Sequence, residues 1–136
     1  EAKAPMIKAT VASIILHPDG SGRFLLARRG TPPFAGYWSL AGGHIDLYER
    51  SIDAARREVR EELGIDFEAR PFRTFDEIIE DQRIHAVVQV FAGPAATDEP
   101  RIDGVEITEA RWATWPEARE LDLAFHHKDI LRAYFG

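Results

Sequence analysis

Three glutamates at helical spacing are the residues of this sequence best suited to chemistry. Glu58, Glu61 and Glu62 are separated by three and four positions, so on a helix their side chains share one face. Like charges at such spacings destabilise a helix by about 0.2–0.5 kcal/mol per pair, and the helix dipole disfavours acids near the C-terminal end. Taken alone, the triplet is most simply a solvated acidic face. A bound divalent cation would turn its repulsion into attraction, so the surrounding segments decide between the two interpretations.

The ligand types available favour a hard cation. The sequence contains no cysteine, which excludes disulfides, thiolate zinc sites and cysteine nucleophiles. Clustered carboxylates without a histidine pair are typical of Mg²⁺ sites, and Mn²⁺ is the expected substitute. The absence of cysteine also fits a reducing compartment, so the expected location is cytoplasmic.

The segment from Glu49 to Leu63 is predicted to be the helix that positions the glutamates. It contains neither glycine nor proline. Its apolar residues recur on one helical face, at Ile52, Ala55, Val59 and Leu63. Gly64 follows directly, where a left-handed residue commonly ends a helix.

The other segments predict a sheet and further helices. The expected elements in chain order are a β-hairpin of 11–16 and 24–27, a functional loop over 30–43, a buried strand over 84–91, a strand over 109–114, a short helix opened by Pro116 and a last helix over 128–135. Pro71 limits any strand around it to an edge or a bend. This order predicts an α/β fold, a mixed sheet with a helix on its face.

Composition limits the domain count and the class of partner. The 136 residues fit a single domain over 1–136, because a chain of this size buries roughly two-thirds of its unfolded surface. The formal charge is 17 − 23 = −6, which argues against binding a nucleic-acid polymer, since such sites need a basic stripe. The longest uncharged apolar stretch, 11–16, is far short of the ~20 residues that span a bilayer. Neither a nucleic acid nor a membrane is expected as a partner.

A longer pattern around the glutamates is typical of one enzyme family. The pattern Gly43-x5-Glu49-x7-Arg57-Glu58-Val59-x-Glu61-Glu62-x-Gly64-Ile65 resembles the signature of the Nudix hydrolases, at every defined position over 23 residues. The flanking segments 38–43 and 111–112 are similar to the family as well. Common family residues are replaced at Ala41, Asp46, Leu47 and Tyr48. None of these is a defined position, so the departures concern the loop geometry and the substrate.

The resemblance implies a Nudix-type α/β/α sandwich and a metal-dependent hydrolysis. The implied reaction is attack by water on phosphorus in the diphosphate linkage of a nucleoside diphosphate derivative. The implied Mg²⁺ ligands are three carboxylates and one backbone carbonyl, those of Glu58, Glu61, Glu62 and Gly42. Arg57 would orient the glutamates, and Glu49 would support the junction between loop and helix.

The base that activates the water is open between two residues. Glu106 lies where several family members place an additional acidic ligand or base, with Asp103 and Glu99 as competitors. Glu58 is the second candidate. We favour Glu106, because a loop acid can approach the substrate from the face opposite the helix.

Basic residues near the signature are expected to bind substrate. Two consecutive arginines end a predicted strand and point to opposite faces, so only one should reach the site, and Arg29 is the candidate. His44 lies inside the signature and is expected to touch the substrate. His85 is expected to be a core residue, whereas His126 and His127 are expected to be an exposed pair at a helix start.

Two similarities point to different substrates. The segment 29–38 is similar to loops of ADP-ribose pyrophosphatases, whereas 42–46 is closer to nucleoside-triphosphate members of the family. The expected partner is therefore a small nucleotide, either a nucleoside triphosphate or an ADP-ribose-like molecule, and a homodimer is left open. The alternative function is a non-catalytic Nudix-fold nucleotide-binding module. Such modules usually lose a glutamate of the signature, and here all are present.

Overall fold

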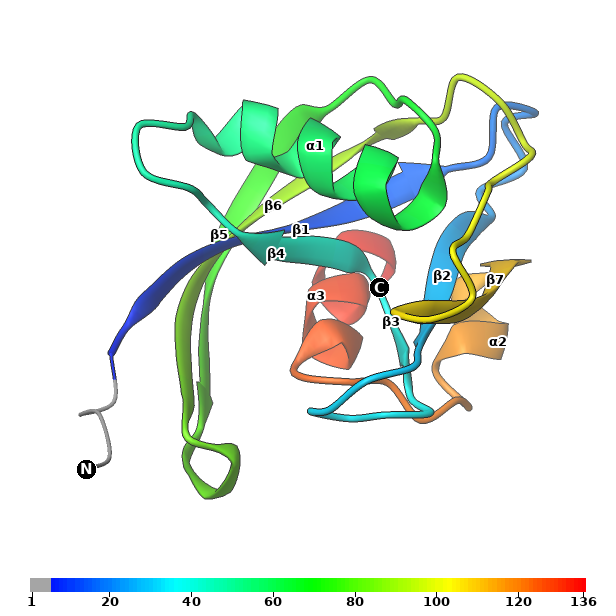
Figure 1. The fold of residues 1–136 in the computed structure, drawn as a ribbon. Helices are drawn as coiled ribbons and strands as arrows, with labels where there is room; N and C mark the ends of the chain where they lie inside the picture. The colour runs from blue at the N-terminus through cyan, green and yellow to red at the C-terminus, as the bar shows by residue number, and fades with distance from the viewer. Residues whose placement is uncertain (1–5) are drawn as a thin grey trace.

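The described residues, 6–136, form a mixed β-sheet between helices in a computed structural model (Figure 1). The strands are β1 Lys8–Leu16, β2 Phe24–Arg29, β3 Trp38–Ser39, β4 Ala41–His44, β5 Arg70–Ile79, β6 Ile84–Pro94 and β7 Ile107–Ala113. Their order is β3-β2-β1-β6-β5, with β4 also pairing with β1 and β7 with β2. β1 runs parallel to β6, and the other pairs are antiparallel.

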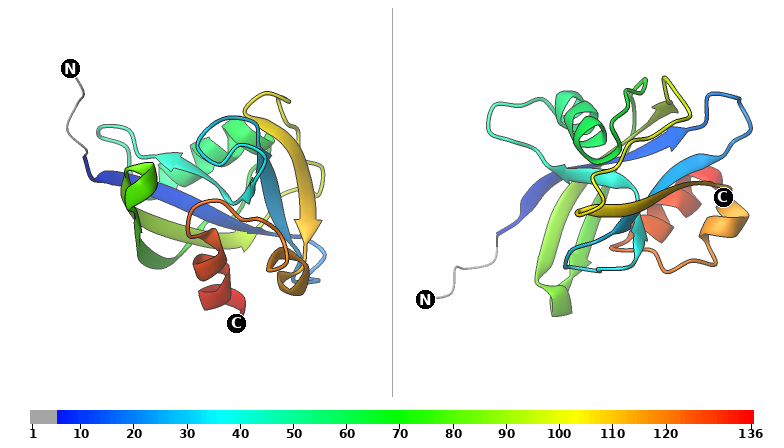
Figure 2. Two further views of the ribbon diagram at one scale, coloured as in Figure 1. Left: turned by 90° about the horizontal axis from the view of Figure 1, so that it is seen from below. Right: turned by 45° about the vertical axis from the view of Figure 1, so that its right-hand side comes forward.

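Helices cover both faces of this sheet, which confirms the predicted α/β/α sandwich. α1 Ser51–Leu63 packs on one face, and α2 Trp115–Ala118 and α3 His127–Phe135 pack on the other (Figure 2). A 3₁₀ turn, η1 Glu80–Gln82, joins β5 to β6. No helix within residues 6–136 is both long and apolar enough to cross a membrane.

The alternation of side chains along β1 divides the core in two. Val11 and Ile15 belong to the cluster beneath α1, whereas Ala12 and Ile14 belong to the cluster beneath α3. Both faces of β1 are therefore buried. This explains why the strand is a nearly continuous apolar run in the sequence.

The predicted signature helix is confirmed, although it begins at Ser51 rather than Glu49. Glu49 belongs to the preceding turn, where its Oε1 accepts the backbone N–H of Asp46 at 3.0 Å. Gly64 ends the helix with φ of 64°, and its N–H is donated to the carbonyl of Arg60. The left-handed cap is thus where the sequence predicted it.

The expected loop over 30–43 was wrong in part, because β3 and most of β4 lie within it. A Cβ added at Gly42 would lie 2.1 Å from the carbonyl oxygen of Val11, so β4 approaches β1 closely enough to require glycine. Glycine carries no hydrophobic signal, and the sequence pattern therefore missed this strand. The predicted hairpin of β1 and β2 is confirmed. Pro71 lies beside a bulge in β5, and β5 is an edge strand, since it pairs only with β6 among the described strands.

Candidate functional site

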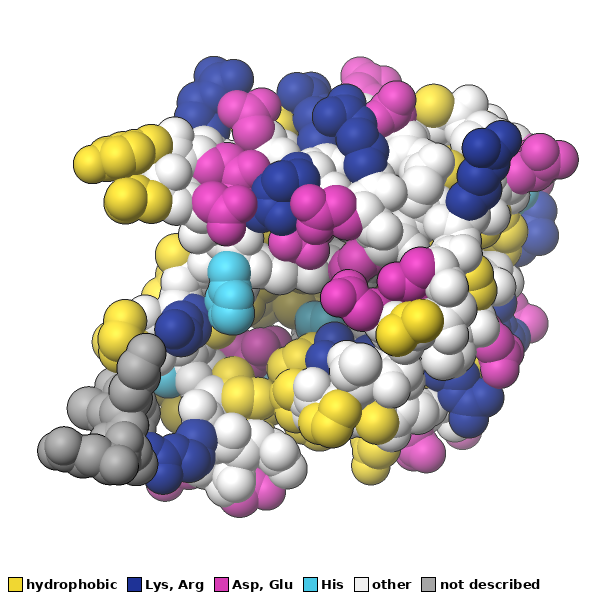
Figure 3. Space-filling model, in the orientation of Figure 1, with side chains coloured by type: hydrophobic (Ala, Val, Ile, Leu, Met, Phe, Trp, Pro, Cys, Tyr) yellow, Lys and Arg dark blue, Asp and Glu magenta, His cyan; other side chains and the backbone are white. Residues whose placement is uncertain are grey.

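A cavity of about 600 Å³ lies on the α3 side of the sheet, a volume in the range of small-molecule sites. Its floor is formed by β1, β6 and the end of β5. One end is closed by Gly42, Gly43 and Glu62, and Arg29 and Phe125 also line the cavity. Figure 3 shows the hollow beneath a band of acidic and basic side chains that belongs to α1.

Glu62 is the acidic group that reaches furthest into the protein. Its carboxylate accepts the backbone N–H of Gly42 at 3.1 Å, which joins the end of α1 to β4. Burial raises the pKa of Glu62 to about 8, and the charge of Glu58 adds to this rise, while the Gly42 hydrogen bond and Arg29 oppose it. The protein therefore holds a carboxylate in a place where its charge is poorly solvated.

Glu58 lies over Gly43, the first residue of the signature. A Cβ added at Gly43 would approach the Glu58 Cδ to 2.6 Å and both carboxylate oxygens to 2.7 Å. Burial also raises the pKa of Glu58, and the hydrogen bond from Arg57 lowers it. The absence of a side chain at Gly43 therefore makes the space for this carboxylate.

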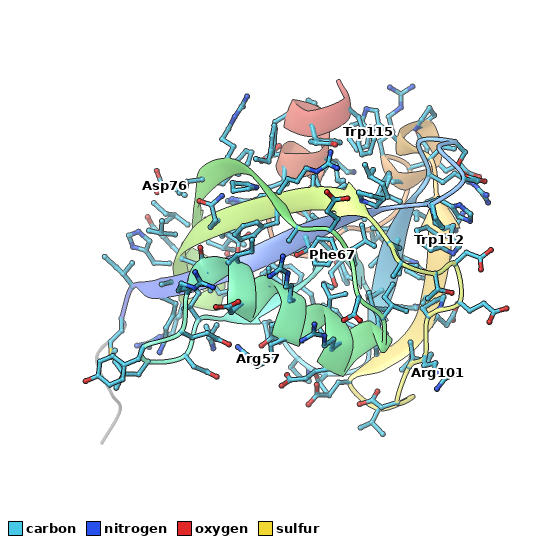
Figure 4. All side chains as sticks on the ribbon, turned by 90° about the horizontal axis from the view of Figure 1, so that it is seen from above. Arg57, Phe67, Asp76, Arg101, Trp112 and Trp115 are labelled. Atoms are coloured by element: carbon cyan, nitrogen blue, oxygen red, sulfur yellow. The ribbon has the colours of Figure 1, made fainter. Side chains whose placement is uncertain are left out.

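Arg57 connects the helix to the turn before it (Figure 4). Its Nη1 donates to Glu58 at 2.7 Å and to Glu61 at 3.3 Å, and its Nε donates to Glu49 at 2.8 Å. Its Nη2 donates to the carbonyl of His44 at 3.0 Å. These bonds, the one to Glu49 above all, raise the pKa of Arg57 above its usual value. The guanidinium fixes three carboxylates and the end of β4 together.

The three glutamates do not converge on one point. Glu62 faces Gly42, Glu58 is held by Arg57, and Glu61 is mostly exposed. As the side chains stand within residues 6–136, no three acidic or histidine side chains are close enough to bind one ion. Arg57 provides the positive charge that partly balances the cluster.

Arg29 lies in the cavity wall, whereas Arg28 pairs with Glu109 at 3.0 Å on the surface. Strand alternation separates the two as expected. The Nε of Arg29 donates to the carbonyl of Pro33 at 2.7 Å, and the guanidinium lies 4.9 Å from the ring centroid of Phe125. Burial lowers the pKa of Arg29, and Glu62 opposes that shift. The cavity thus has a fixed, partly buried cation near its acidic end.

The remaining sequence candidates lie around the rim. His44 is exposed at the end of β4 and lines the cavity. Glu106 is exposed before β7 and lies outside the cavity wall. Burial is the main cause of the raised pKa of Glu62, and the charge of Glu106 raises it further. Asp103 accepts the backbone N–H groups of Val105 at 2.9 Å and Ile107 at 3.3 Å. Its carboxylate is therefore engaged in the turn.

Two cavity residues were not identified from the sequence. His127 was expected to be exposed, but it is 7% exposed and lines the cavity, because it begins α3 where that helix packs against the sheet. Its Nδ1 accepts the backbone N–H of Leu40 at 3.0 Å. Glu77 on β5 is 6% exposed and also lines the cavity. The sequence could have indicated that Glu77 is buried, because Phe75 and Ile79 are each two residues from it and therefore share its face of the strand. His85, expected in the core, is half-buried at the cavity rim.

This geometry provides two chemically different regions within one cavity. Carboxylates and glycine backbone occupy the end formed by α1 and β4, a donor set suited to a hard cation and to phosphate bound through it. An arginine, an aromatic ring, a buried carboxylate and a buried imidazole line the rest. Such a combination suits a ligand with an anionic part and a planar polar part.

Comparisons with known proteins identify relatives of this chain. The chain is 32% identical over 117 residues to an isopentenyl-diphosphate Delta-isomerase of Cutibacterium acnes, which covers 76% of this chain and 59% of that protein. It is 28% identical to the nucleoside triphosphatase NudI of Escherichia coli, over 93% of this chain and 96% of NudI. A crystal structure of a MutT NUDIX hydrolase from Burkholderia pseudomallei matches with a TM-score of 0.81 and 28% identity, over 93% of this chain and 97% of that one.

The first of these relatives is much longer than the part that matches, since the chain spans little more than half of its length. The family assignment does not depend on that relative. The family model of the NUDIX domain matches residues 6–134, nearly the whole chain. The predicted family is therefore confirmed, and this chain belongs to the NUDIX domain family.

Proposed function

We propose that this chain hydrolyses the diphosphate linkage of a nucleoside diphosphate derivative, with Mg²⁺ as its cofactor and Mn²⁺ as a substitute. The observation that carries the proposal is the placement of Glu62 and Glu58 against Gly42 and Gly43, at one end of a cavity of about 600 Å³. The names of two relatives, a nucleoside triphosphatase and a MutT NUDIX hydrolase, support the same chemistry.

The donor types of the signature helix fit a hard cation, and Glu58 and Glu61 would turn toward Glu62 to share it. Glu58, Glu61 and Glu62 would hold it with the carbonyl of Gly42, an all-oxygen donor set. Burial of Glu62 and Glu58 penalises their charged forms, as the raised pKa of each carboxyl indicates, and a nearby cation would remove that penalty. The chemistry that a bound Mg²⁺ would supply is polarisation of a phosphoryl oxygen and a lower pKa for a bound water.

The protein's own residues then have separate tasks. Arg57 holds Glu58 and Glu61 in place through its Nη1. Arg29, fixed by Pro33 and Phe125, presents a cation to the phosphate, and His44 contacts the substrate from the end of β4. Preorganised charges of this kind stabilise the charge that develops in the transition state.

Glu106 is proposed as the general base. The oxygen of the attacking water forms a bond to phosphorus while the bridging P–O bond breaks. The electron pair of the broken bond stays on the oxygen of the leaving group, and the proton of the water passes to the Glu106 carboxylate. Its exposed position before β7 lets it approach from outside the cavity wall.

A substrate screen tests the proposal directly. Nucleoside triphosphates, ADP-ribose and nucleotide sugars are incubated with Mg²⁺, and released phosphate, pyrophosphate or monophosphate is measured. We expect turnover of at least one substrate, dependent on Mg²⁺ or Mn²⁺ and lost when Glu58, Glu61 and Glu62 are all replaced by Gln. The matched control replaces three exposed acids outside the site, Glu68, Glu120 and Asp129, by their amides. Tight nucleotide binding without turnover would instead indicate a non-catalytic binding module.

A further inference from the structure

Glu77 is a buried carboxylate that the hydrolysis proposed above does not use. It lies on β5 opposite Ala86, on the face of the sheet that forms the cavity floor. Its Oε2 accepts the backbone N–H of His126 at 3.3 Å. Within residues 6–136, Glu77 forms no ion pair. Burial raises the pKa of Glu77, and the His126 hydrogen bond opposes that shift.

A structural role accounts for only part of this arrangement. The bond to His126 joins β5 to the start of α3, but a glutamine carbonyl would accept the same N–H without burying a charge. A carboxylate has about four acceptor positions on two oxygens, and one hydrogen bond leaves most of them free. Because Glu77 lines the cavity, a ligand there meets an acceptor with unused capacity.

His127 provides a donor in the same cavity. Its Nδ1 accepts the N–H of Leu40, so the proton of the neutral ring is on Nε2. Burial lowers the pKa of His127 to about 3, with Arg29 as a smaller contributor, so the ring stays neutral at pH 7. The backbone N–H of His126, which binds Glu77, places the acceptor beside the chain segment that carries this donor.

We propose that Glu77 and His127 recognise the base of the nucleotide, and that they select an edge with two adjacent N–H donors next to a carbonyl. Guanine has this edge, in its ring N1–H and exocyclic amino group beside O6. The Glu77 carboxylate accepts from the two N–H groups, and the His127 Nε2–H donates to the carbonyl oxygen.

The other common bases match this pair less well. Adenine presents one amino group beside a ring acceptor, and its acceptor would face the carboxylate. Uracil and thymine present one N–H between two carbonyls, so one carbonyl would oppose a carboxylate oxygen. Each polar group left unpaired in a buried site lowers the affinity. The proposal rests on the proposed function in assuming a nucleotide ligand, and it names the base that the cavity prefers.

Binding of nucleoside monophosphates tests this inference without any hydrolysis. Calorimetry measures the Kd of GMP, IMP and AMP for the full chain. IMP differs from GMP only in lacking the exocyclic amino group, so it removes one of the two donors. We expect GMP to bind at least tenfold more tightly than IMP or AMP. Equal affinities, or no measurable binding of GMP, would overturn the inference even if the chain hydrolyses nucleotides.

Variants identify the residue responsible. Glu77→Gln keeps an acceptor for the His126 N–H, and we expect it to bind GMP no more tightly than IMP while retaining its melting temperature. The matched control is Asp76→Asn, because Asp76 is the adjacent acid of β5, exposed on the opposite face (Figure 4); it should keep the preference. A preference that persists in Glu77→Gln contradicts the assignment. If that variant fails to fold, the comparison of GMP with IMP in the wild type still decides whether the amino group is read.

Discussion

The carboxylate of Glu58 occupies the space where a side chain at position 43 would begin. An added Cβ at Gly43 would lie 2.6 Å from the Glu58 Cδ, and its contacts are all with the far end of one flexible side chain. At Gly42 the corresponding contact is with the backbone, 2.1 Å from the Val11 carbonyl oxygen. Adjacent glycines are thus required for different reasons, one by the site and one by the sheet.

Alanine should therefore affect activity at position 43 and stability at position 42. Gly43→Ala displaces Glu58 but not the backbone, so we expect stability within about 1 kcal/mol of wild type and a loss of activity of at least tenfold. Gly42→Ala forces β4 away from β1, and we expect it to lose roughly 1–3 kcal/mol of stability. Urea denaturation and steady-state kinetics measure the two effects. Equal destabilisation by both variants would contradict the distinction.

Glu62 is more deeply buried than Glu61, so replacing each by Gln should affect stability differently even if both bind the metal. Replacing Glu62 by Gln removes a buried carboxylate and keeps an acceptor for the Gly42 N–H, so the metal-free variant should be as stable as wild type or more stable. Glu61 is mostly exposed, and Glu61→Gln should leave stability nearly unchanged. If both residues are metal ligands, both variants lose activity.

Activity and melting temperature give the measurement. We expect Glu62→Gln to lose more than tenfold in kcat, about 1.4 kcal/mol, and to show a smaller rise in melting temperature with Mg²⁺ than wild type. Retention of more than a tenth of the wild-type kcat would exclude Glu62 as a direct ligand. A full Mg²⁺-induced rise would place the cation elsewhere.

The sequence predicted the signature helix well because its information is local. Apolar spacing, the absence of glycine and proline, and Gly64 all act within a few turns, and the contact of Arg57 with Glu61 follows from their i, i+4 spacing on that helix. The family signature then located one end of the cavity. What it implied for the metal ligands and the base is still a prediction.

The rest of the cavity depends on long-range pairing that no local pattern contains. Glu77 meets the start of α3 across 49 positions of sequence, and His127 meets Leu40 across 87. A polar histidine at the start of a helix is usually exposed, and its neighbours in the sequence give no sign that His127 is buried. Only the packing of α3 against the sheet buries it. The same reasoning explains β4, whose glycines become a strand by pairing with β1.

His127 should make the protein less stable in acid. Its pKa is about 3 in the folded protein, against 6.5 for an unperturbed histidine in the unfolded chain, so the folded state binds fewer protons. The contribution is fully present above pH 6.5 and is lost as the pH falls toward 3, with about 2 kcal/mol lost by pH 5. Glu77, whose pKa is raised, acts with the opposite sign, so the comparison must be made between variants.

His127→Asn isolates this contribution. Asparagine is neutral, and its amide oxygen can accept the Leu40 N–H, so the variant should lose the extra acid sensitivity of wild type between pH 6.5 and 4. His126→Asn keeps the Leu40 contact and serves as the control. Urea denaturation at several pH values gives the slope for each protein. An unchanged slope in His127→Asn would show that the imidazole is not kept neutral by its burial.

The general base can be separated from the metal ligands by combining kcat with the Mg²⁺ requirement. Loss of a base alone typically lowers the rate by roughly 10²–10⁴-fold and flattens the acidic limb of the pH–rate profile, whereas loss of a ligand also raises the Mg²⁺ concentration for half-maximal rate. Glu106→Gln should show the first pattern and Glu58→Gln the second. Glu120→Gln, which replaces an exposed acid just after α2, should show neither.

The opposite result has a definite meaning as well. Glu58 is half-buried with a raised pKa, a property also expected of a general base. If Glu106→Gln stays within a few-fold of the wild-type kcat at saturating Mg²⁺, while Glu58→Gln removes the acidic limb with no change in Mg²⁺ requirement, Glu58 is the base. The bond from Arg57 to Glu58 would then position the base instead of a ligand, and Arg57→Lys, which cannot form the same fork of hydrogen bonds, should lower kcat with little change in the Mg²⁺ requirement.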